Sequence, residues 1–203
     1  MAKQDQSFVL RRLHSLLGVI PLGVFLIQHL LVNHQATVSV ERFNWAAGIM
    51  GNLPFVLFLE IFVIYIPILF HGIYGVYIAF TARNNVGAYN TFRNWMFVLQ
   101  RFSGVIAFVF IAVHVFQTRV QVFFGAEVNF DMVADVVTNP FWFAFWFVGI
   151  IATVFHFANG LWTFMITWGF TQSARSQRIM SYVSLAVFLV VSFIGIQALF
   201  SFI

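Results

Sequence analysis

Residues 155–162, Phe-His-Phe-Ala-Asn-Gly-Leu-Trp, repeat the pattern of residues 70–77, Phe-His-Gly-Ile-Tyr-Gly-Val-Tyr. Each segment reads Phe-His, three residues, Gly, an aliphatic residue and an aromatic residue. His156 follows His71 by 85 residues, and His114 follows His29 by the same interval. All four histidines lie in apolar runs, so the sequence predicts two structurally related halves, each carrying two histidines.

The composition is that of a membrane protein. Of the 203 residues, 62% are hydrophobic and 8% are charged, and the mean hydropathy is +0.93; a soluble domain carries about 25% charged residues. Apolar runs of membrane-spanning length recur along the chain. The absence of Cys excludes disulfides, thiolate metal sites and iron–sulfur ligation within this chain. The net charge of +4, confined to loops, gives no reason to expect nucleic-acid binding.

Five apolar runs predict an all-α, polytopic membrane protein in which residues 1–203 form one domain. The expected membrane helices cover residues 13–32, 55–80, 95–123, 140–170 and 180–202. Residues 33–53 and 125–139 are expected to be loops. Pro21 and Pro67 are expected to kink their helices, because proline removes a backbone hydrogen bond. The first run lacks a small-residue cleavage site, so we expect a retained helix and no signal peptide.

The distribution of charge orients the chain. One set of boundaries carries most of the cations, whereas the opposite set carries Arg42, Arg119 and most of the acidic residues. Positive residues mark the cytoplasmic side, so the N-terminus is expected inside and the C-terminus outside. The cationic set comprises Lys3, Arg11, Arg12, Arg83, Arg93, Arg101, Arg175 and Arg178.

This orientation predicts two levels of histidines. At 1.5 Å per residue, His29 and His114 lie near the outer side, and His71 and His156 lie roughly 10–15 Å deeper. Ionisable residues inside a membrane are costly and indicate function. Two imidazoles at one depth on different helices suit the two axial positions of a haem. The pattern therefore predicts two bis-histidine b haems stacked across the membrane.

Simpler readings exist for each feature. A lone membrane histidine usually makes a helix–helix hydrogen bond, and a zinc or copper transport site is an alternative for the whole set. Gly75 and Gly160, each four residues after an inner histidine, are expected to leave room for a porphyrin or to be close-packing contacts. His14 and His34 lack a partner at the 85-residue interval and are expected to be interfacial.

The motifs resemble a known family. The chain is similar to the dihaem cytochrome b membrane anchor of succinate dehydrogenase from Gram-positive bacteria at residues 11–18 (RRLHSLLG), 28–30 (QHL), 70–75 (FHGIYG), 92–95 (FRNW), 113–115 (VHV) and 155–162 (FHFANGLW). Residues 100–104 (QRFSG) resemble the Arg-x-Ser-Gly motif of the wider anchor family. The likeness extends over essentially the whole chain.

The resemblance implies a multi-pass subunit of the bacterial plasma membrane that holds a flavoprotein and an iron–sulfur protein on its cytoplasmic face. Electrons would pass through two b haems to menaquinone, with no dicarboxylate site in this chain. The inner haem would be bound by His71 and His156, and the outer haem by His29 and His114. Related fumarate reductases place an acid in the fourth helix, which this chain lacks.

Further residues are candidates for the haem surroundings. The inner candidates are Arg11, Arg12, His14, Arg83 and Arg175. The outer candidates, near the haem or the quinone, are Asn33, His34 and Arg119. The alternative functions are a dihaem anchor for another dehydrogenase, such as a hydrogenase or formate dehydrogenase, and a haem or metal transporter.

Overall fold

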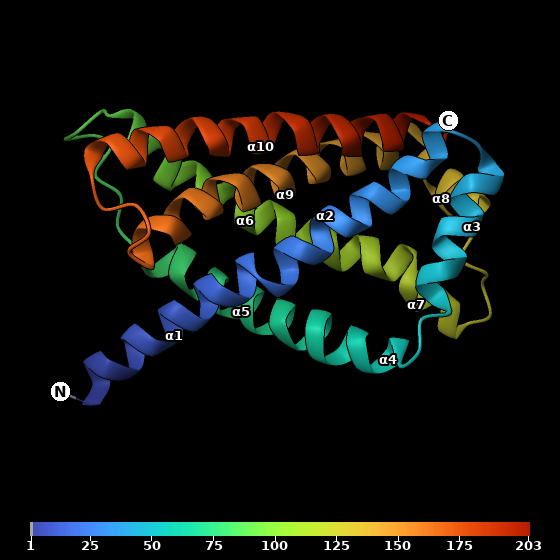
Figure 1. The fold of residues 1–203 in the computed structure, drawn as a ribbon, viewed down its shortest axis with the longest axis horizontal. Coiled ribbons are helices and arrows are strands. Elements are labelled where there is room, and N and C mark those ends of the chain that lie inside the picture. The colour runs from blue at the N-terminus through green and yellow to red at the C-terminus, as the bar shows by residue number, and fades with distance from the viewer. Residues whose placement is uncertain (1) are drawn as a thin grey trace.

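The structure is a computed structural model that describes residues 2–203, with side chains from Gln6 onward, and the described part contains helices and no strands (Figure 1). The long elements are α1 (Ala2–Val19), α2 (Pro21–Asn33), α5 (Ile66–Thr81), α6 (Phe92–Gln117), α9 (Pro140–Thr167) and α10 (Ala174–Phe200). The short elements are η1 (His34–Thr37), α3 (Val40–Gly51), α4 (Val56–Leu59), the π-helical η2 (Glu60–Tyr65), α7 (Arg119–Phe123) and α8 (Phe130–Val137).

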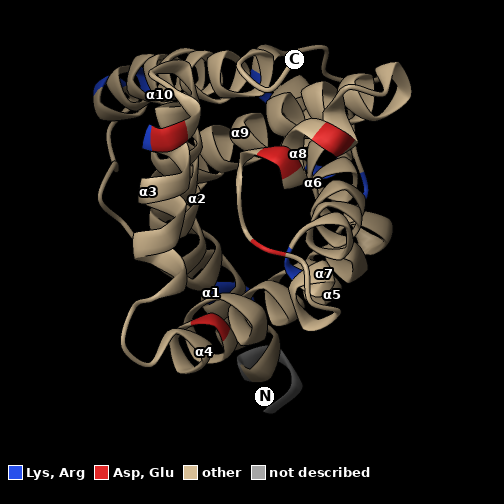
Figure 2. Cartoon of the chain, turned by 90° about the vertical axis from the view of Figure 1, so that its right-hand side faces the viewer, with Lys and Arg blue, Asp and Glu red and all other residues tan. Residues whose placement is uncertain are grey.

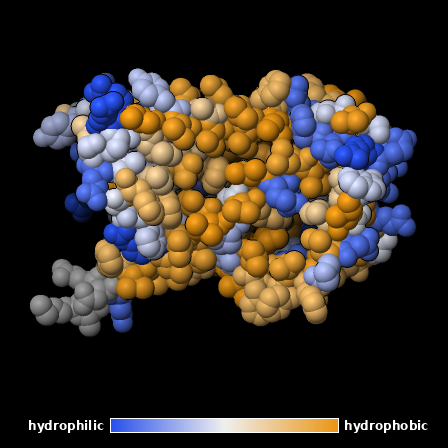
Figure 3. All heavy atoms as spheres, viewed as in Figure 1, coloured by the Kyte–Doolittle hydropathy of each residue, from blue (hydrophilic) through white to orange (hydrophobic). Residues whose placement is uncertain are grey.

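Helical segments of membrane-spanning length confirm the expected all-α, five-span fold. Among the described residues they cover Gln6–Thr37, Val56–Thr81, Phe92–Phe123, Pro140–Thr167 and Ala174–Phe200. Many large apolar side chains on these segments are exposed, which suits contact with lipid. Figure 3 shows this apolar surface as a band between two more polar ends.

Local sequence sets where the helices begin. Thr91 caps α6 by accepting a hydrogen bond from the Asn94 N–H, and Asn139 caps α9 ahead of Pro140. Ser173 and Ser176 form a capping box at the start of α10. Such caps satisfy N–H groups that a helix leaves unpaired in its first turn, so each of these helices begins in the polar connection before its apolar run.

The two halves differ by one residue within their first helices. His29 follows Gly18 by 11 residues, whereas His114 follows Gly104 by 10. The first half is interrupted at Ile20, between α1 and α2, whereas α6 runs without a break. Pro21 lacks the N–H that a continuous helix needs. The chain is therefore interrupted next to Pro21, where a kink is expected, and we infer that this break absorbs the extra residue.

The outer connections are more ordered than expected. The expectation of loops at residues 33–53 and 125–139 is wrong in part, since η1, α3 and α8 lie there. Ser39 and Asn129 cap α3 and α8. Both helices are shorter than a membrane span, so a search for long apolar runs passes over them.

The short helices complete the core at the outer end. This cluster of buried residues comprises Ala36, Phe43, Ala47, Phe110, Val133, Val137, Trp146, Leu199 and Phe202. The acidic residues beyond the N-terminal segment also gather at this end, which faces the viewer in Figure 2. The fold thus has a distinct outer end, opposite the N-terminus, that joins α3 and α8 to the ends of α6, α9 and α10.

Candidate functional site

The structure brings the four membrane histidines together as two pairs. His71 on α5 and His156 on α9 have ring centroids 5.9 Å apart, with an interplanar angle of 81°. His29 on α2 and His114 on α6 have ring centroids 5.8 Å apart, with an angle of 76°. These are the pairings expected from depth in the sequence.

This spacing fits one metal ion within each pair. A metal binds an imidazole nitrogen at about 2 Å, so rings with centres about 6 Å apart leave room for one ion between them. No group of three or more His, Cys, Asp or Glu side chains that could hold a metal occurs among residues 2–203. Zinc sites need three or four protein ligands, whereas a haem iron takes only its axial ligands from the protein. The donor set therefore fits haem.

Backbone carbonyls orient both inner imidazoles. The Nδ1–H of His71 donates to the His14 carbonyl at 2.9 Å, and the Nδ1–H of His156 donates to the Gln100 carbonyl at 2.9 Å. A carbonyl only accepts, so each Nδ1 carries the proton and each Nε2 keeps a free lone pair. Such a partner on the second nitrogen is typical of metal-binding histidines.

The two orienting positions are related by the repeat. Gln100 follows His14 by 86 residues, and Gly104 follows Gly18 by the same interval. A Cβ on Gly104 would lie 2.7 Å from the His156 ring, and a Cβ on Gly18 would overlap the His71 ring. Glycine at these positions is what lets both inner imidazoles approach the neighbouring helix.

Gly75 and Gly160 occupy a different part of the site. A Cβ on Gly75 would lie 3.0 Å from His14 Nε2, and one on Gly160 would lie 3.3 Å from Gln100 Nε2. These glycines therefore face the side chains at the two orienting positions. The expectation that they leave room for a porphyrin remains a prediction.

Gln100 and Asn159 form an inner network that sequence reasoning did not assign to the site. The Gln100 amide donates to the His156 carbonyl at 3.0 Å, and the Asn159 amide donates to Gln100 Oε1 at 2.7 Å. Asn159 is buried at 9% relative exposure. A comparison of the two halves at an interval of 86 residues, rather than 85, would have identified Gln100 as the counterpart of His14.

His14 and His34 lie in different surroundings. The ring of His14 stacks on that of His71, with centroids 4.1 Å apart and an interplanar angle of 4°. Its Nε2 is buried without a hydrogen-bond partner among the described residues, so His14 belongs to the inner site and is not simply interfacial. His34 instead donates from Nδ1 to the Ile194 carbonyl on α10 at 3.2 Å.

The outer pair has mostly apolar neighbours. His114 packs against Trp146 and Phe110, with ring centroids 4.6 and 5.6 Å away. Its Nδ1 is buried and has no hydrogen-bond partner in the part of the chain described. Asn33 donates to the His29 carbonyl at 2.8 Å, with the same nitrogen 3.4 Å from His29 Nε2. Asn33 therefore lies beside His29, and its role near an outer haem or quinone remains a prediction.

The arginines expected around the cofactors take several roles. Arg12 donates to the Thr167 carbonyl and lies over the Trp168 ring, which ties α1 to the end of α9. Arg119 forms a two-bond ion pair with Glu60, at 2.8 Å for each bond. Exposed positions are occupied by Arg11, Arg83 and Arg175.

Comparison with known proteins identifies the family of the chain. Residues 82–195 match the family model described as succinate dehydrogenase/fumarate reductase transmembrane subunit. The chain is 53% identical over 199 residues to the succinate dehydrogenase cytochrome b558 subunit of Bacillus subtilis (strain 168). The aligned region covers 98% of each of the two chains. This chain therefore belongs to the family of succinate dehydrogenase/fumarate reductase transmembrane subunits.

Proposed function

We propose that this chain is the membrane-anchor cytochrome b subunit of a bacterial succinate dehydrogenase. In this role it carries two b haems and passes electrons from an iron–sulfur subunit on the cytoplasmic face to menaquinone. A flavoprotein subunit of the same complex would oxidise succinate outside this chain. The observation that supports the proposal most directly is the pairing of the histidines at centroid separations of 5.8 and 5.9 Å.

The proposed ligands are assigned by pair. His71 and His156 would hold the inner haem, and His29 and His114 would hold the outer one. A bound haem supplies one-electron chemistry, with a potential set by its axial ligands, hydrogen bonds and burial. The protein contributes the ligand positions and the tautomers fixed at Nδ1 of His71 and His156.

The arrangement supports transfer across the membrane. The inner pair lies beside α1 and the early turns of α6, and the outer pair lies near the ends of α2 and α6. Within α6, the residues that contact His156 are Gln100 and Gly104. They lie 14 and 10 residues before His114, which is about 15–21 Å of helix. Two redox groups at these levels would shorten each electron-transfer step relative to a single crossing.

The decisive experiment counts haem in the purified complex. We expect a reduced-minus-oxidised spectrum with two low-spin b-type signals and two haems per polypeptide, in a complex that retains a flavin-bearing partner. A sample that binds no haem, or only one, would contradict the site assignment. If two haems were present but the partner were a hydrogenase or a formate dehydrogenase, the haem sites would be supported and the proposed enzyme complex would be wrong.

A further inference from the structure

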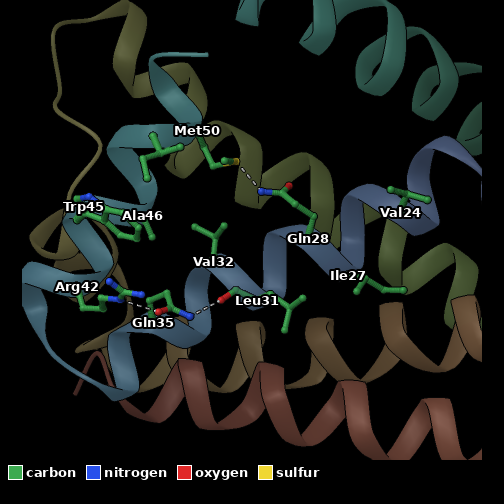
Figure 4. A pocket seen from close by; sticks show the side chains of 11 residues that line it. Val24, Ile27, Gln28, Leu31, Val32, Gln35, Arg42, Trp45, Ala46 and Met50 are labelled. Atoms are coloured by element: carbon green, nitrogen blue, oxygen red, sulfur yellow. Dashed lines mark hydrogen bonds between the residues drawn. The ribbon is translucent and has the colours of Figure 1, made fainter.

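A pocket of about 560 Å³ lies between α2 and α3 at the outer end, and its lining includes none of the four paired histidines (Figure 4). Its lining includes Gln35, Arg42 and Trp45 at the end where η1 meets α3. Val24 and Ile27 line it further along α2. The pocket is therefore polar at one end and apolar towards the membrane interior.

The polar end holds a cation without a carboxylate partner. Arg42 donates from Nε to Gln35 Oε1 at 3.1 Å, and its guanidinium lies 4.4 Å from the centre of the Trp45 ring. Within the described residues, the one ion pair joins Arg119 to Glu60. Among residues 2–203, no protein group accepts a hydrogen bond from the Nη groups of Arg42. A guanidinium fixed in this way is suited to bind a phosphate.

The apolar end is open to lipid along α2. Val24, Ile27 and Leu31 line the pocket and are 65%, 40% and 47% exposed. From Gln35 to Val24 the helical rise is about 16 Å, which is the length of a substantial part of an acyl chain. An acyl chain lying here would cover side chains that the protein itself leaves uncovered.

The pocket is poorly suited to a redox substrate. His29 is absent from its lining, and the His29 ring faces His114 of α6 instead. The amide of Gln28 is already engaged, because it contacts Met50 Sδ at 2.8 Å. A quinone head group is neutral and would leave the charge of Arg42 unmatched. The position and charge of the pocket therefore favour an anionic ligand over a quinone.

We propose that this pocket binds an anionic glycerophospholipid of the outer leaflet. Its phosphate would accept hydrogen bonds from Arg42, and one acyl chain would lie along Val24, Ile27 and Leu31. The lipid would fill the space between α2 and α3 and so brace the outer end of the first span. This inference depends on the membrane orientation and is independent of the haem assignments.

The test uses the whole purified complex in neutral detergent, with phosphatidylglycerol brominated on its acyl chains as the probe. Bromine quenches nearby indole fluorescence, and the contribution of Trp45 is isolated by subtracting the signal of Trp45→Phe. We expect saturable quenching of Trp45 by this lipid, and weaker quenching by brominated phosphatidylcholine.

Arg42→Gln should weaken phosphatidylglycerol binding about fivefold, the order expected for one membrane-surface cation. Leu31→Trp, measured by native mass spectrometry, should exclude the lipid by filling the groove.

The controls separate this site from other sources of binding. Arg178→Gln removes an exposed arginine at the opposite end of the molecule and should leave the Trp45 signal unchanged. Inorganic phosphate should not displace the lipid, since it lacks the acyl chain; displacement at equal concentration would overturn the proposal. Equal affinity of wild type and Arg42→Gln, or displacement by a short-chain menaquinone analogue, would also overturn it.

Discussion

The inner and outer histidine pairs have nearly the same distance between ring centroids, 5.9 and 5.8 Å, but their rings are held in place by different contacts. Each inner imidazole donates from Nδ1 to a backbone carbonyl, at His14 or Gln100. Among the described residues, the outer imidazoles make no such bond, and His114 is held between aromatic rings. A fixed Nδ1–H makes the other nitrogen a better donor to a metal. The comparison predicts two chemically distinct sites, the inner one set by hydrogen bonds and the outer one by packing.

Replacing a ligand gives the largest expected effect. His71→Leu should remove the inner haem signal, and His29→Leu should remove the outer one, because each haem loses one of its two axial ligands. Low-temperature difference spectra measure which haem signal is lost. The haem-to-polypeptide ratio is expected to fall by half in each variant.

His34→Gln is the matched control for the ligand replacements. His34 bonds to the Ile194 carbonyl and belongs to neither pair, so both haems should remain. If His71→Leu and His29→Leu removed the same signal, the division into inner and outer sites would be wrong.

A smaller effect is expected where the glycines touch the inner rings. Gly18→Ala and Gly104→Ala place a Cβ against His71 and His156, and overpacking of this kind costs about 1–3 kcal/mol. The inner low-spin electron paramagnetic resonance signal should shift or broaden, while the outer signal stays unchanged. Gly48→Ala is the control, because nothing lies within 4 Å of its added Cβ. An altered outer signal alone would contradict the assignment of these glycines.

The hydrogen-bond network of the inner site is tested by Asn159→Ala. This change removes the bond from the buried Asn159 to Gln100 Oε1 and leaves a half-buried acceptor without its donor, which costs about 1 kcal/mol. We expect a lower thermal midpoint of the complex and a shifted inner-haem potential, with the outer potential constant. Asn52→Ala deletes a similar amide bond at an exposed site and should change stability by less than about 0.5 kcal/mol. Equal effects of the two variants would show that the network has no special role.

The sequence predicted the spans and the histidine pairs because both depend on long-range regularities. Five apolar runs give five helices, and equal intervals along parallel helices give equal depth. The orienting carbonyls at His14 and Gln100 were not predicted, since any residue type supplies a carbonyl and the choice depends on how two helices pack. His14 and Gln100 are equivalent positions of the two halves, but they are 86 residues apart, whereas the paired histidines are 85 residues apart. The difference arises because the interruption at Ile20 adds one residue to the first half.

The short outer helices show a second limit of sequence reasoning. In α8, Val133 and Val137 are buried while Asp131 and Asp135 are exposed, which is helical periodicity over only two turns. A run this short is compatible with a loop or a helix, and its packing on α3, α9 and the end of α10 decides the outcome. The pocket beside Arg42 is lined by residues of α2, η1 and α3, so it too depends on how helices pack, and no motif in the sequence indicated it.

The smallest expected effect concerns the ion pair between Glu60 and Arg119, which joins the π-helical η2 to the start of α7. The two side chains are 17% and 28% exposed, so solvent screens the pair in part, and its net contribution is about 1 kcal/mol. Glu60→Gln and Arg119→Gln should each lower the thermal midpoint slightly. The double variant should lose less than the sum of the two, because the second change has no partner left to remove. Arg119 lies five residues after His114, so any shift in haem potential should fall on the outer haem, and a shift confined to the inner haem would contradict the placement of this ion pair beside the outer site.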